Sequence, residues 1–126
     1  MPMDLSFEHP GEYLFVRRVG ADRITVVDRD IGASFLLAPD RIVENWPVTA
    51  SAGLGQAEAD TILEMKPEVV LLGTGERQVF PPAEIMASFL RRGVGIEVMT
   101  NAAAARTYSL LAGEGRRVVA AFILPG

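Results

Sequence analysis

The residues best placed for chemistry end an apolar, strand-like run, EVVLLGTG, at Gly73, Thr74 and Gly75. Proteins of the α/β class place phosphate-binding turns directly after buried strands. A dinucleotide fingerprint also needs a third glycine and a helix that follows at once, but the sequence ERQVFP intervenes here. A P-loop is excluded because no Gly-Lys-Ser/Thr follows. The three residues indicate a ligand-contacting loop or a structural turn, and the turn is the favoured interpretation.

A second run, GIEVMTN, ends at Thr100 and Asn101, just before an alanine-rich stretch. Asn101 is the predicted N-cap of a helix, and the free amides of a helix N-terminus can hold an anion. Arg106 follows about one and a half turns later, and Arg77 lies in the loop after Gly75. If the two loops meet at the carboxyl ends of parallel strands, these residues form a crevice of anion size. The alternative is that Asn101 only caps its helix, and this is the favoured interpretation.

The sequence contains no motif typical of other catalytic chemistries. The chain has one histidine, His9, and no cysteine, so a zinc site would need carboxylate ligands. His9 opens a turn-like His-Pro-Gly stretch, and no nucleophile elbow is present. Asp28, Asp30 and Asp40 lie in predicted turns, and no pair of carboxylates stands out. We therefore predict no catalytic residue, no metal and no cofactor.

Length and composition indicate one globular α/β domain over residues 1–126. Hydrophobic residues make up 49% of the chain, which argues against disorder. No apolar run approaches the roughly 18 residues of a membrane span, and the start MPMDLSFEHP does not read as a signal peptide. The net charge of −4 argues against nucleic acid as a partner. We expect a soluble cytoplasmic protein with no direct membrane insertion.

The first third of the chain predicts short antiparallel strands joined by turns, and the rest predicts helices alternating with strands. The strand order at the front stays open. The expected front strands are 13–18, 23–28, 34–37 and 41–43, with turns at 30–32 and 38–40. The expected helices are 58–66, a helix from Pro82 that stops at Gly93, and a helix that begins at Asn101.

Three side chains on each of the last two expected helices form the predicted core-facing stripes. These are Ile85, Phe89 and Leu90 on the second helix, and Thr107, Leu110 and Leu111 on the third. Trp46, the single tryptophan, is either an exposed anchor for a partner or a core residue, and the core is the favoured interpretation.

The expected fold is therefore a compact three-layer α/β domain. Its mixed sheet has antiparallel front strands and a C-terminal parallel βαβαβ unit with right-handed crossovers.

The segments LLGTG, FPP and RRGVGIEVMTNAAAARTYSLLAGEGRRV, with the final apolar strand, resemble a known family. It is the small α/β family of unknown function whose eukaryotic relatives include respiratory complex I assembly factor 3. The resemblance is strong over residues 68–124 and looser before them, where Trp46 also fits. Family members often carry an aspartate before this helix, a cysteine within it and an asparagine after the tyrosine. Thr100, Ala104 or Ala105, and Ser109 hold those places here, so no reactive cysteine is expected.

The resemblance implies a three-layer domain with a central mixed sheet, no established catalytic residues, and an accessory role with an unidentified protein partner. The leading hypothesis is thus a non-enzymatic protein-binding module, an assembly or biogenesis accessory of a membrane complex. The alternative is a binder of a small molecule or anion, or an enzyme, that uses the loops after the parallel strands; a purely structural homo-oligomer is a third possibility. The candidate ligand- or partner-binding residues are Gly73, Thr74, Gly75, Arg77, Thr100, Asn101 and Arg106.

Overall fold

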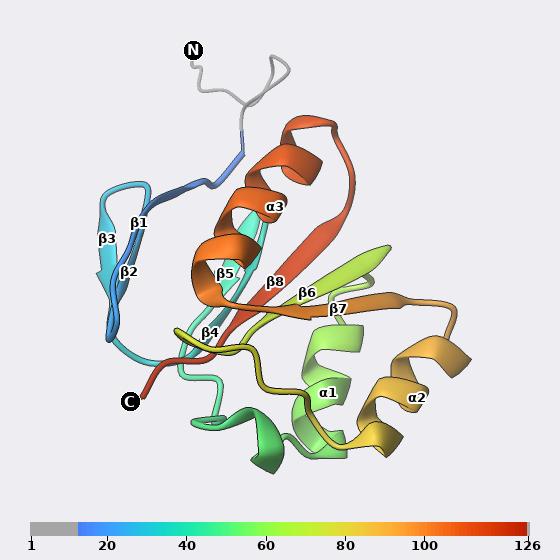
Figure 1. The fold of residues 1–126 in the computed structure, drawn as a ribbon. Helices are drawn as coiled ribbons and strands as arrows, with labels where there is room; N and C mark the ends of the chain where they lie inside the picture. Colours follow the sequence, from blue (N-terminus) through green and yellow to red (C-terminus); the bar gives the residue numbers. More distant parts are fainter. Residues whose placement is uncertain (1–12, 126) are drawn as a thin grey trace.

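The computed structural model describes residues 13–125, and His9 with the acidic N-terminal stretch lies outside this range (Figure 1). The strands are β1 (Val16–Val19), β2 (Ile24–Val26), β3 (Arg29–Ile31), β4 (Phe35–Ala38), β5 (Arg41–Val43), β6 (Val69–Gly73), β7 (Gly95–Met99) and β8 (Val118–Phe122). The helices are the 3-10 turn η1 (Ser51–Gly53), α1 (Gln56–Leu63), α2 (Ala83–Arg91) and α3 (Asn101–Gly113).

The strands form two sheets, an antiparallel one in the order β1-β2-β3 and a mixed one in the order β5-β4-β8-β6-β7. In the mixed sheet, β6 lies between β7 and β8 and runs parallel to both. Strand β4 pairs antiparallel with β8 on one side and with β5 on the other. The expected α/β fold with a C-terminal βαβαβ unit is confirmed. The structure adds that the front strands are divided between the two sheets.

Each face of the mixed sheet carries its own hydrophobic core, which explains why its central strands read as continuous apolar runs. On β8, Val118, Ala120 and Phe122 face one core, together with α3 and the three-stranded sheet. The alternate residues Val119 and Ala121 face the other core, together with α1 and α2. Figure 1 shows α3 and the three-stranded sheet apart from α1 and α2. The result is a layered domain around a sheet that is buried on both sides.

The predicted turn at residues 30–32 is wrong. Arg29–Ile31 is strand β3, and the chain reverses one step earlier, where Val27 has a φ of 56°. The hairpin pairs Ile24 with Ile31, and Ile31 is buried in the core. Burial of Ile31 requires this register, whereas the aspartate at position 30 and the glycine at position 32 misleadingly suggested a turn.

The prediction that Leu90 and Leu110 face the core is also wrong, because they are 62% and 63% exposed. On α2 the buried stripe contains Ser88 beside Ile85 and Phe89, and the Ser88 hydroxyl accepts a hydrogen bond from the Gln56 amide.

On α3 the buried residues are small apart from Tyr108, so the helix approaches the sheet through alanines rather than leucines. Thr107 and Leu111, the other residues of the predicted stripe, are only partly buried. The buried set on this helix is Asn101, Ala104, Ala105, Tyr108 and Ala112.

Trp46 is a core residue, as predicted, with 3% of its surface exposed. Its indole N–H donates to the carbonyl of Glu58 at 3.2 Å, which fixes the loop after β5 against α1. The first helix begins and ends slightly earlier than predicted, at Gln56 and Leu63.

Adjacent residues of α2 provide a test of this packing. We expect Phe89→Ala to lower the free energy of unfolding by about 3–5 kcal/mol, because the ring is fully buried. Leu90→Ala, one residue along, should change it by less than about 0.5 kcal/mol. Urea denaturation of the two variants measures both values, and equal losses would contradict the orientation of the helix.

The ion pair between Arg117 and Asp40 predicts a pH dependence. Arg117 Nη1 lies 2.7 Å from Asp40 Oδ1, and the same guanidinium donates to the carbonyl of Met65. The hydrogen bond from Arg117, aided by its charge and opposed by partial burial, lowers the pKa of Asp40. A carboxylate with a lowered pKa stabilises the fold above its unfolded pKa of about 3.9, and this contribution is lost as pH falls through the folded pKa.

We therefore expect Asp40→Asn to destabilise the protein at neutral pH by at most about 1 kcal/mol, since the pair is largely exposed. The difference from the native protein should disappear in acid. Urea denaturation at several pH values measures it, and a difference that does not depend on pH would contradict this assignment.

Candidate functional site

The loops after β6 and β7 meet at the carboxyl ends of these two strands. These strands are parallel neighbours, yet α2 and α3, which follow them, cover opposite faces. The Thr74 amide donates to the carbonyl of Met99 at 3.0 Å, and the Asn101 amide donates to the carbonyl of Gly75 at 2.8 Å. This is the topological switch point at which α/β sheets commonly bind ligands.

Thr100, and not Asn101, is the N-cap of α3, so that prediction is wrong. The Thr100 hydroxyl accepts a hydrogen bond from the amide of Ala103 at 3.2 Å. Asn101 is the first residue of the helix, and its side chain turns inward, with 3% of the residue exposed. Its Nδ2 donates to the carbonyl of Ile123 at 3.0 Å. The asparagine thus ties the start of α3 to the end of β8.

Gly73 leaves the space that the Asn101 amide occupies. A Cβ at position 73 would lie 2.3 Å from Asn101 Oδ1, well inside van der Waals contact. That oxygen is buried and has no hydrogen-bond partner among the described residues. The Gly73 carbonyl accepts from the amide of Ile123 at 2.9 Å. Gly73 and Asn101 therefore join the carboxyl ends of β6 and β8 to the first turn of α3.

The loop that follows β6 satisfies its own polar groups. The Thr74 hydroxyl donates to the carbonyl of Arg77 and accepts from the amide of Val79 at 3.1 Å. Gln78 Nε2 donates to the carbonyl of Val98 at 2.8 Å. Many of the hydrogen-bonding groups that a ligand could use at this sheet edge are therefore already bonded within the protein.

Two adjoining hollows lie on the side of this junction that faces β1. The first has a volume of about 310 Å³ and is lined by Val19, Gly20, Ala21, Gly75, Glu76, Thr100, Asn101 and Ala102. The second has a volume of about 470 Å³ and is lined by Val16, Arg17, Arg18, Val19, Ala102, Ala105, Arg106 and Ser109. Because they share Val19 and Ala102, we describe them together as the β1/α3 trough.

Only some of the predicted site residues line the trough. Gly75, Thr100 and Asn101 line the first hollow, and Arg106 lines the second. The remaining three, Gly73, Thr74 and Arg77, line neither of these hollows. The loops therefore come together as the hypothesis requires, but Arg106 lies at the adjoining part of the trough rather than with Arg77.

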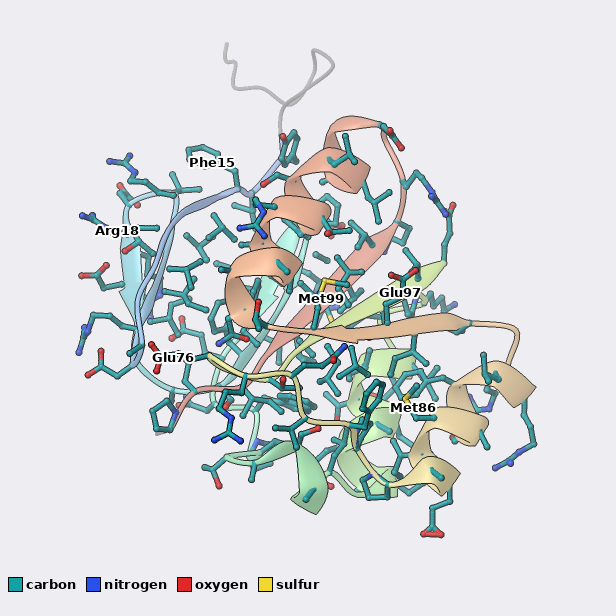
Figure 2. All side chains as sticks on the ribbon, viewed as in Figure 1. Phe15, Arg18, Glu76, Met86, Glu97 and Met99 are labelled. Carbon is teal, nitrogen blue, oxygen red and sulfur yellow. The ribbon has the colours of Figure 1, made fainter. Side chains whose placement is uncertain are left out.

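Sequence reasoning missed Arg17, Arg18 and Glu76. Arg17 and Arg18 are both exposed and line the second hollow beside Arg106. Figure 2 shows Arg18 on the three-stranded sheet and Glu76 in the loop after β6, on the same side of the molecule. The adjacent arginines were visible in the sequence. Their proximity to Arg106 depends on the packing of β1 against α3.

The polar groups beneath the trough are structural. The Tyr108 hydroxyl donates to the carbonyl of Leu14 at 2.6 Å, joining α3 to the residues before β1. Burial raises the pKa of this phenol well above its usual value, so the hydroxyl stays protonated and serves as a donor. Among residues 13–125, no group of three or more His, Cys, Asp or Glu side chains is arranged to hold a metal ion.

A sequence profile of the family described as "Protein of unknown function (DUF498/DUF598)" matches residues 16–123. The chain belongs to this family. The family resemblance predicted from the C-terminal half is thereby confirmed, and the match extends through the front strands.

One solved structure and two named proteins are similar to this chain. The solution structure of XCC1710 from Xanthomonas campestris is 48% identical and superposes with a TM-score of 0.84, covering 98% of this chain and 94% of that protein. The "13 kDa major membrane protein" of Francisella tularensis subsp. holarctica is 40% identical over 63 residues, 50% of this chain. NADH dehydrogenase [ubiquinone] 1 alpha subcomplex assembly factor 3 of Danio rerio is 38% identical over 64 residues, 51% of this chain.

The match spans 51% of the Francisella protein and 37% of the Danio rerio protein. Within residues 13–125, no helix combines the length and the apolar character that crossing a membrane requires.

The contact between Gly73 and Asn101 can be tested with two glycines. We expect Gly73→Ala to destabilise the protein by roughly 1–3 kcal/mol, because the added methyl overlaps the buried amide. Gly95→Ala is the matched control, since the nearest atom to its Cβ lies 3.8 Å away, and it should cause no loss. Thermal unfolding compares them. The double variant Gly73→Ala/Asn101→Ala should lose less than the sum of its single variants, and strict additivity would contradict the contact.

Proposed function

We propose that this protein is a non-enzymatic protein-binding module that serves as an assembly or biogenesis accessory factor for a membrane complex. The observation that carries the proposal is the 38% identity over 64 residues with an assembly factor of the NADH dehydrogenase alpha subcomplex. The human protein of the same name is 34% identical over 64 residues. Both are named for assembly, which requires association with other proteins.

The arrangement of polar groups supports a binding role over a catalytic one. At the switch point, Thr74, Gln78 and Asn101 use their side chains to hold loops and strand ends together. The charged side chains that line the trough are three arginines and one glutamate. Arginine is enriched at the interfaces through which proteins associate.

The site of action that we propose is the cytoplasmic side of the membrane that holds the complex. A protein of this kind associates with membrane subunits through its surface and is not itself inserted. Cell fractionation with and without a salt wash tests this part of the proposal, with release of the protein by salt as the expected result.

The main test is affinity capture of the tagged full-length protein from its native lysate, followed by mass spectrometry. Subunits of one membrane complex should be recovered repeatedly. In cells that lack the protein, native gels should show that complex accumulating as subassemblies. Leu90→Ala, a surface change on α2, should leave recovery unchanged. Absence of a reproducible partner together with normal assembly of membrane complexes would contradict the proposal.

A second candidate function is binding of a small anion, which the arginine-lined hollow at Arg106 favours. Inorganic phosphate and pyrophosphate should then raise the melting temperature of the native protein. Arg106→Ala should abolish this shift without lowering the melting temperature in plain buffer, since Arg106 is exposed. An equal shift in the variant would exclude this site.

A further inference from the structure

We propose that the β1/α3 trough is the docking surface for an acidic, extended segment of a protein partner. This inference rests on the proposed function, because it assigns a surface and a partner chemistry to a protein-binding module. It is carried by the shape of the trough, the sign of its charges and the local backbone of β1.

The charge of the trough is opposite to that of the chain as a whole. The net charge is −4, yet the charged side chains that line the second hollow are Arg17, Arg18 and Arg106, with no acid among them. The ion pairs among residues 13–125 use other arginines, at positions 23, 29, 116 and 117. Three guanidinium groups in one hollow, with no carboxylate from residues 13–125 lining it, favour a ligand that supplies carboxylates.

The backbone of β1 brings two of these cations together. In a regular strand, successive side chains point to opposite faces of the sheet. The pairing of β1 with β2 shifts between Val16 and Arg18, and such a bulge re-aims a side chain. Arg17 and Arg18 are consequently both exposed, while Val16 and Val19 are half-buried on either side of them. The irregularity therefore increases the positive charge on the exposed side of the strand.

Small side chains of α3 line the trough. Ala102, Ala105 and Ser109 line it from α3, with the spacing of three and four residues that places them on one helix face. At about 1.5 Å per helical residue they span roughly 10 Å, the length of about three residues of extended chain. Strand β1 hydrogen-bonds to β2 on one side and has no strand on its other side within the described residues.

Glu76 makes the two hollows of the trough different in charge. It lines the first hollow, whereas the three arginines line the second. A bound segment would therefore place its carboxylates over the arginines and neutral or basic residues toward Glu76. This polarity favours a peptide over nucleic acid, whose uniform phosphate charge would meet Glu76 and the negative charge of the chain.

Fluorescence anisotropy with a labelled octapeptide of alternating Glu and Val tests the inference on the full-length protein. The peptide should bind at low salt and dissociate as salt is raised. Arg17→Glu/Arg106→Glu should weaken binding roughly ten-fold or more. The matched control is Arg91→Glu/Arg92→Glu, an exposed basic pair at the end of α2, outside the trough, and it should keep most of the affinity. Circular dichroism confirms that each variant is folded.

Several results would overturn the inference. One is equal binding of a Lys/Val octapeptide, and another is equal loss of affinity in both double variants. Failure of the Glu/Val peptide to bind, or stronger binding of a labelled oligothymidylate or of inorganic phosphate, would also exclude an acidic peptide as the occupant.

Affinity capture separates this inference from the proposed function. If native protein and Arg17→Glu/Arg106→Glu recover the same membrane-complex subunits in equal amounts, the trough is not the docking surface, while the assembly role stands. If the native protein recovers no subunits but binds the Glu/Val peptide through its arginines, the assembly role fails and the trough keeps its specificity. Selective loss of those subunits in the arginine variant, and not in the control pair, is the result expected.

Discussion

Burial of the five-stranded sheet on both faces is the constraint on which the rest of this structure depends. Strands β4 and β8 are buried along their whole length, and β6 is buried over all but its first residue. Alternate side chains of these strands supply two separate cores, so no polar side chain can be accommodated along them without a partner. Helices must cover both faces, and polar chemistry is confined to the strand ends and the outer surface.

At the ends of the parallel strands, a buried polar side chain joins separate elements of the fold. Asn101 is buried at the start of α3 and donates to the end of β8, and the absence of a side chain at Gly73 makes room for it. Together with the backbone bonds between the two loops, this arrangement occupies part of the position at which α/β proteins often hold a ligand. The switch point is therefore mainly a structural junction, and open space remains beside it, between α3 and β1.

The trough beside that junction combines features from distant parts of the chain. Arg17 and Arg18 come from an irregular strand near the front, and Arg106 from a helix near the end. The Tyr108 hydroxyl holds these parts together through the carbonyl of Leu14. The trough presents exposed arginines beside small residues of α3. The trough is the surface that we propose for a partner segment, and two relatives are named as assembly factors.

The sequence by itself determined the βαβαβ order, the family and the burial of Trp46, because apolar runs, glycines and prolines encode local structure directly. It also singled out the two loops that meet. The tertiary structure alone decided that Ile31 pairs in a strand, that Leu90 and Leu110 face outward, and that Asn101 turns inward instead of capping its helix. It also decided that Arg106 lies beside two arginines of β1. Each of these depends on contacts between residues far apart in the chain, and the pattern of a single segment does not record which partner it will meet.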